Sequence, residues 1–154
     1  MKNQHHSPCI IFLFLFCLIS AAAADVHQGV GVGFIFGAPT GLSAKKWCAP
    51  QQAFDAAAAW STGEQKSFYF HADYLYQQPQ ALPVHSLFMD WHYGFGGMIR
   101  FDDRTVLGIR LPFGLDYGFK TIPVEIFAEI VPVVLLAPGT GFDIDGGIGI
   151  RLFL

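Results

Sequence analysis

The chain has 154 residues, of which 53% are hydrophobic, 16% are aromatic and only 14% are charged. This composition excludes disorder, because disordered chains combine low hydrophobicity with high charge. Nine Lys and Arg stand against 12 Asp and Glu with no basic run, so nucleic acid is not an expected partner. The length suffices for one domain.

Residues 1–24 have the pattern of a cleaved secretory signal peptide. Lys2 supplies the positive start, residues 10–19 form an apolar core, and residues 22–24 are small residues at the cleavage positions. A membrane-anchoring helix is the alternative, but a spanning helix needs about 20 apolar residues, twice this core. The mature chain is predicted to be a single domain over 25–154. Loss of Lys2 takes the net charge from −3 to −4.

After residue 24 the apolar residues alternate with a period of two, and Gly and Pro separate the alternating segments, which predicts β-strands. Eight strands are predicted, at about residues 29–37, 42–47, 53–61, 66–77, 86–100, 105–117, 122–131 and 142–154. Residues 78–85 contain Pro79 and Pro83 and are expected to form a link. Residues 53–61 are rich in Ala, which favours a helix, but their alternation favours a strand.

Cys48 is the one cysteine that remains after signal removal. It has no intramolecular partner, so the fold must be stable without a disulfide. We expect Cys48 to act as a small apolar residue rather than as a reactive thiol.

The last five predicted strands have two unlike faces. One face carries aliphatic and aromatic residues and no charge, whereas the other carries nine charged residues: Asp73, Asp90, Arg110, Asp116, Glu125, Glu129, Asp143, Asp145 and Arg151. A soluble barrel or sandwich would turn the apolar face inward, and a membrane barrel would turn it toward lipid. The size of the apolar face, the Gly-rich opposite face without Lys, and Trp47, Trp60 and Trp91 as boundary residues favour the membrane barrel.

The length agrees with this interpretation. A membrane-spanning strand needs about 9–11 residues, and eight strands with short turns consume the mature chain. Only a closed barrel pairs every backbone group in hydrocarbon. The predicted fold class is therefore all-β: a closed, antiparallel, up-and-down transmembrane β-barrel of eight strands. Side chains fill a lumen of this size, so no open channel is expected.

The nine charged residues are predicted to form an ion-paired interior network, because a buried charge without a partner is costly. Acidic groups outnumber Arg110 and Arg151 in this set. Some of the carboxyl groups are therefore expected to be protonated, hydrated or close to a rim.

Several segments carry a resemblance to known proteins. Residues 149–154 (GIRLFL) resemble the terminal strand of bacterial outer-membrane proteins, although the final residue is not the usual aromatic. With residues 39–43, 72–75, 108–114 and 127–132, the chain resembles a family of small, functionally uncharacterised outer-membrane β-barrel proteins with the eight-stranded OmpA/OmpX-like architecture. The resemblance implies the outer membrane of a Gram-negative bacterium, contact with its lipid, and recognition of Leu152 and Leu154 by the barrel-assembly machinery. It implies no catalytic residue, and we expect a monomer.

Patterns that would indicate chemistry are incomplete. Residues 29–33 (GVGVG) lack the spacing of a dinucleotide-binding loop, and are expected to be strand glycines facing a tight lumen. Residues 143–146 (DIDG) begin like a calcium loop, but the position of the required Glu is Leu154. His71 and His92 share the charged face and could bind a metal, although interior hydrogen bonding is favoured. No metal or cofactor is therefore predicted.

A lipid-modifying enzyme of the outer membrane is a further alternative, with His92, Ser86 and Asp90 as candidate residues. Ser86 and His92 lie six residues apart on one predicted strand, roughly 20 Å when extended, so they cannot form a hydrogen-bonded pair. Our hypothesis is a non-enzymatic integral outer-membrane barrel, porin-like in architecture, with a structural or surface-interaction role in the cell envelope. The rival is a secreted soluble β-barrel that binds an apolar ligand.

Overall fold

The computed structural model describes residues 28–61, 67–84 and 87–154. The predicted signal peptide and Ser86 lie outside these residues. The strands are β1 (Val30–Ala38), β2 (Gly41–Ala49), β3 (Gln52–Ser61), β4 (Ser67–Val84), β5 (Leu87–Phe101), β6 (Thr105–Arg110), β7 (Phe113–Gly118), β8 (Val124–Ala137) and β9 (Gly141–Phe153). In the described ranges, no helix is long and apolar enough to cross a membrane.

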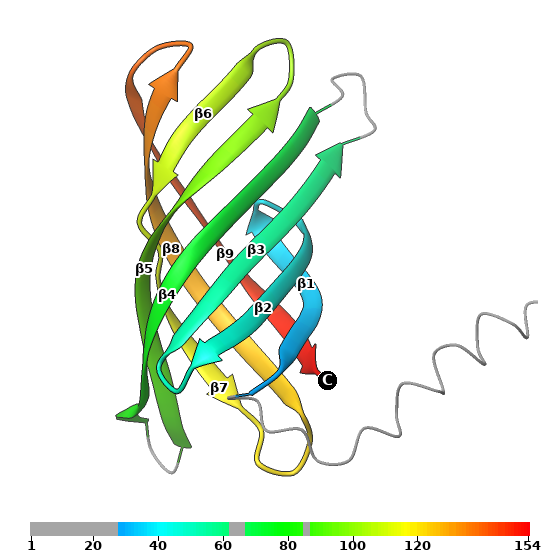
Figure 1. Ribbon diagram of the computed structural model, residues 1–154, viewed down its shortest axis with the longest axis vertical. Helices are drawn as coiled ribbons and strands as arrows, with labels where there is room; N and C mark the ends of the chain where they lie inside the picture. Colours follow the sequence, from blue (N-terminus) through cyan, green and yellow to red (C-terminus); the bar gives the residue numbers. More distant parts are fainter. Residues whose placement is uncertain (1–27, 62–66, 85–86) are drawn as a thin grey trace, which may run out of the picture.

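All strands belong to one antiparallel sheet, which confirms the all-β prediction. Its order is β4-β3-β2-β1-β9-β8-β6-β5-β7, with further pairings of β4 with β5 and of β8 with β7. Figure 1 shows the strands inclined to a common axis and wrapped around an interior. The start of β1 and the end of β9 meet at one end of the sheet, where the Leu154 N–H donates to the Val30 carbonyl at 2.9 Å. We call this the terminal end.

The paired residues of successive strands are offset along the strand direction. A path that starts at Leu152 of β9 and crosses from partner to partner returns to β9 at Phe142, ten residues earlier. It passes through Val32, Ala44, Ala56, Ala72, Gly97, Ile109 and Val134. The strands are therefore staggered as well as tilted.

The Ala-rich segment is a strand, as the alternation predicts. Gln52–Ser61 pairs with β2 on one side and with β4 on the other. Its side chains alternate between buried and accessible, with Ala53 and Ala57 buried and Phe54 and Trp60 exposed. Hydrogen bonds to two neighbouring strands thus override the intrinsic helix preference of Ala.

Two strands extend beyond the predicted ends. The predicted link at 78–85 is wrong, because β4 continues to Val84 beside β5. A bulge between Gln78 and Leu82 interrupts the ladder there, and bulges are among the places where a sheet tolerates Pro. β8 likewise runs past the predicted end at 131 to Ala137.

One predicted strand is divided. The segment at 105–117 is split into β6 and β7 at Leu111 and Pro112, so the described residues form nine strands rather than eight. Pro112 has no N–H to donate to the ladder. Hydrogen bonds still cross the break, from the Leu111 N–H to the Pro132 carbonyl and from the Gly94 N–H to the Pro112 carbonyl, both at 3.0 Å. The two pieces together occupy one strand position between β5 and β8.

Charged and large apolar side chains lie on opposite faces of the sheet. We call the side with the buried residues the inner face and the other side the outer face. The face predicted to be apolar is the outer face, where Phe95, Phe142 and Ile148 are 56%, 66% and 63% exposed, whereas Arg110 on the inner face is fully buried. Apolar residues of the inner face form only small clusters, such as Ile35 with Ala57 and Phe127.

Trp47 departs from its predicted place at a membrane boundary. It lies on the inner face, buried against Ala53 and Phe153. The reason is the phase of β2, in which Ser43, Lys45 and Trp47 all point inward. Trp60 and Trp91 are exposed on the outer face.

Candidate functional site: a buried ion-pair network

Arg151 of β9 organises the first part of the inner face. Its guanidinium donates to Asp55 of β3 at 2.6 and 2.8 Å, to Glu125 of β8 at 3.1 Å and to the Ser43 hydroxyl of β2 at 3.0 Å. The guanidinium also lies 3.8 Å from the centre of the Phe127 ring. One buried cation thus connects four strands of the sheet.

Lys45 of β2 extends this chain of contacts. Its ammonium lies 3.0 Å from Glu125 and 3.4 Å from Asp116 of β7. Asp116 in turn contacts Nδ1 of His92 on β5 at 2.5 Å. Because Glu125 accepts from both Lys45 and Arg151, the contacts run without a break from Asp55 to His92.

Arg110 of β6 is the centre of a second cluster. Its Nε donates to both oxygens of Asp73 at 3.0 and 3.2 Å, and its Nη1 donates to the Tyr69 hydroxyl at 2.6 Å and to Asp145 at 3.2 Å. The Tyr69 hydroxyl donates to Asp145 at 2.8 Å. Glu129 lies 3.5 Å from Nη2 of Arg110.

Seven of the nine predicted network residues are brought together in these two clusters: Asp73, Arg110, Asp116, Glu125, Glu129, Asp145 and Arg151. Asp90 is buried elsewhere, at the β4 bulge, where it accepts from the Gln80 N–H and the Gln77 amide. Asp143 is exposed and accepts from the Ile144 N–H, so it stands outside the two clusters. Asp143 is the third residue of β9, two residues before Asp145.

Sequence reasoning missed Lys45 and Asp55. The charged pair Lys45-Lys46 interrupts the apolar alternation in the sequence of β2, yet only Lys45 points inward, where it is 1% exposed. Lys45 lies two residues after Ser43 and therefore on the same face of β2, which is the signal that the sequence offered. The register of β2 with β3 then places Lys45 opposite Asp55. A third buried cation reduces the excess of acids, but six carboxyl groups still surround three cations in the two clusters.

Glycines of the inner face give the large polar side chains their room. A Cβ on Gly114 would collide with the His92 ring, and a Cβ on Gly149 would collide with the Phe127 ring. The lumen is therefore packed to the point at which one methyl group matters. Four buried polar atoms have no hydrogen-bond partner among the described residues: Nδ1 of His71, Nε2 of His92, Oε1 of Gln77 and Nη2 of Arg110.

The histidines do not build a metal centre. Within the described ranges, no group of three or more His, Cys, Asp or Glu side chains is arranged to hold a metal ion. His92 pairs with Asp116, and the buried hydroxyl of Ser43 accepts from Arg151. Ser86, the third candidate for lipid chemistry, falls outside the described residues.

Cys48 is an exposed residue near the end of β2. Its thiol contacts the Gln52 carbonyl at 3.3 Å.

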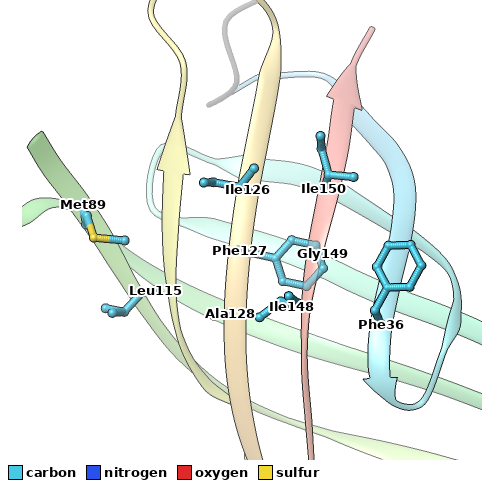
Figure 2. Close-up of a pocket in the computed structure, with 9 residues that line it drawn as sticks. All are labelled: Phe36, Met89, Leu115, Ile126, Phe127, Ala128, Ile148, Gly149 and Ile150. Atoms are coloured by element: carbon cyan, nitrogen blue, oxygen red, sulfur yellow. The ribbon is translucent and has the colours of Figure 1, made fainter.

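The outer face carries apolar hollows instead of polar sites. Figure 2 shows one of about 420 Å³ that crosses β1, β9, β8, β7 and β5, and its lining includes Phe36, Met89, Leu115, Ile126 and Ile148. Such a surface offers hydrocarbon contact and almost no hydrogen bonding.

Comparison with protein-family descriptions, curated proteins and solved structures finds no match for this chain.

Proposed function

We propose that this protein is a small integral β-barrel of the bacterial outer membrane, with an ion-paired, packed interior and a structural or surface-interaction role. The observation that carries the proposal is the inversion of the usual soluble arrangement. Lys45, Arg110 and Arg151 are at most 2% exposed, while large apolar side chains cover the outer face. Exposed apolar patches of a soluble monomer rarely exceed a few hundred Å².

The pairing pattern supports a closed barrel of eight strand positions. β4 pairs with β3 on one side and with β5 on the other, so the pairings have no end. The offset of ten residues on one circuit, from Leu152 to Phe142, is the stagger that closure of tilted strands requires. A closed ring of paired strands has no edge strand, which is what a sheet in hydrocarbon requires.

The packed inner face argues against an open pore and against an apolar ligand inside. Side chains just fill the interior of eight-stranded barrels, and here the interior side chains are charged and mutually paired. A hydrocarbon ligand would have to displace these ion pairs. The proposed partner is therefore the lipid around the outer face.

The C-terminal strand supports delivery to the outer membrane. Leu154 is exposed and Leu152 is partly exposed, both on the outer face, at the end of a strand that pairs with β1 and β8. We propose that the barrel-assembly machinery recognises this strand, after the segment 1–24 has directed the chain through the inner membrane.

Membrane fractionation tests the proposal. The full chain, expressed in a two-membrane bacterium, is expected to stay in the outer-membrane fraction after carbonate and high-salt washes. On detergent gels the unboiled protein is expected to migrate differently from the boiled protein, because a folded barrel resists unfolding. Release by the washes, with one mobility on both gels, would instead support the secreted soluble rival.

A further inference from the structure

Lys46 is an unusual residue of the outer face. Among the described residues, it is the one charged side chain at an outward position of a strand. It is exposed, and no ion pair joins it to any described residue. Its neighbour Lys45 points inward and forms ion pairs with Glu125 and Asp116. The sequence therefore places an unpaired cation on a hydrocarbon-covered surface.

The neighbours of Lys46 mark a boundary between apolar and aqueous surroundings. Lys46 pairs with Phe54, which pairs with Tyr74. Outward rings continue from there around the terminal end, with centres 5.0 to 5.6 Å apart between successive members: Phe54, Tyr74, Tyr76, Tyr93 and Trp91. Tyr and Trp gather at the headgroup level of membranes, and Lys side chains extend to that level.

An apolar groove begins directly next to Lys46 on the side away from the terminal end. Its floor includes the paired small residues Ala44 and Ala56. Phe34, Leu42 and Phe70 form its walls, and the hollow that these residues share with Ala56 and Ala58 has a volume of about 570 Å³. We call this hollow the alanine groove. Ala44 and Lys46 are successive outward residues of β2, roughly 7 Å apart along the strand.

We propose that the alanine groove and Lys46 form a binding site for an anionic phospholipid, with an acyl chain in the groove and the phosphate at the Lys46 ammonium. The inference rests on the proposed membrane function. Each part of the site matches one part of the ligand: an apolar groove for hydrocarbon, a ring of aromatics at headgroup level, and an unpaired cation for the phosphate.

Charge argues against a second copy of the chain as the occupant. A symmetric contact across the groove would bring two Lys46 side chains onto one apolar surface. The outward strand positions of the described residues offer no acidic group to pair with them. A phospholipid supplies the missing negative charge.

Spin-labelled lipids test the proposal with the full-length chain folded into phosphatidylcholine vesicles. Electron spin resonance measures how strongly labelled phosphatidylglycerol, relative to labelled phosphatidylcholine, joins the immobilised shell around the protein. The wild type is expected to prefer phosphatidylglycerol about fivefold, the ratio that corresponds to about 1 kcal/mol for one basic residue at an anionic surface.

Substitutions of Lys46 and of Ala56 test the two parts of the site separately. Lys46→Gln is expected to reduce the preference to near one, and Lys46→Arg to retain it. Ala56→Phe fills the groove while keeping the charge, and is also expected to lose the preference. Lys120→Gln is the matched control, because Lys120 is an exposed cation at the same end of the sheet, in the turn after β7, away from the groove.

A preference that survives Lys46→Gln, or that falls equally in Lys120→Gln, would overturn the site. Concentration-dependent cross-linking of two chains through the groove would overturn it in favour of a second copy. Insertion is scored separately, by the mobility of unboiled protein on gels. Failure of the wild type to insert would refute the membrane function and the site with it, whereas insertion without lipid preference would refute the site alone.

Discussion

At the scale of single residues, this protein keeps its charges inside and bonds them to one another. Arg151 alone satisfies two carboxylates and one hydroxyl on three other strands. Burial of such ions is expensive, and their attraction compensates only where geometry and additional hydrogen bonds are good. Each cation here has at least two acidic partners.

Removal of one member of a buried ion pair should therefore lower the free energy of unfolding. Arg151→Met leaves Asp55 and Glu125 without their shared cation, and we expect the free energy of unfolding to fall by about 3–5 kcal/mol. Urea unfolding of vesicle-folded protein, followed by Trp fluorescence, measures the change. Arg100→Met is the control, because the Arg100–Asp102 pair is about one third exposed and should contribute at most about 1 kcal/mol. Equal losses in both variants would contradict a network held by buried pairs.

The glycines that face His92 and Phe127 give a second residue-level prediction. Gly114→Ala places a methyl group against the His92 ring, and overpacking of this kind typically costs about 1–3 kcal/mol. Gly97→Ala is the matched control in the neighbouring strand, because its Cβ would meet only the Gly108 carbonyl oxygen at 3.6 Å. The same unfolding measurement applies, and a neutral Gly114→Ala would show that the lumen has free space.

At the scale of elements, period-two alternation predicts where the strands lie. The positions of Pro and Gly predict less well where the strands end. The strand at 53–61 was predicted from period-two alternation against the helix preference of Ala. The extension of β4 past Pro79 and Pro83 could not be predicted, because a bulge and its hydrogen bonds to Asp90 depend on β5 lying alongside. The division at Pro112 follows from its missing N–H, but the bonds that bridge the break come from β5 and β8.

The outer face of β9 yields an element-level prediction. Ile148 lies midway along this strand and is 63% exposed, so the membrane proposal puts it in hydrocarbon. Ile148→Lys should destabilise the vesicle-folded protein by about 2–4 kcal/mol, the cost of a cation near the bilayer centre. Gly139→Lys, in the turn before β9, where a Cβ would meet open space, should be nearly neutral. If Ile148→Lys is equally neutral, the outer face does not contact lipid.

At the scale of the whole molecule, buried ion pairs join strands that are tilted and staggered around a common axis. Two clusters of ion pairs, one around Arg110 and one around Lys45 and Arg151, span the interior. Each cluster links strands from different parts of the chain, so it also holds the strands of the sheet together around the axis.

Electrical recording from planar bilayers gives the whole-molecule prediction. The inserted wild type is expected to show no stable porin-like conductance steps, because charged side chains fill the lumen rather than line a water-filled channel. Insertion is verified on the same preparation by its gel mobility before heating. Reproducible ohmic steps in proportion to inserted protein would contradict a packed interior.

The sequence by itself determined most of the strands and their two unlike faces, because a pleated strand sends alternate side chains to opposite faces whatever its neighbours are. Only the tertiary structure decided which face is buried and which charges meet. Lys45 lies 71 residues from Asp116, and Arg151 lies 96 residues from Asp55, so their contacts depend on the stagger of the strands, which no local pattern encodes. The same stagger aligned Ala44 with Ala56, next to Lys46 on β2, and so created the groove.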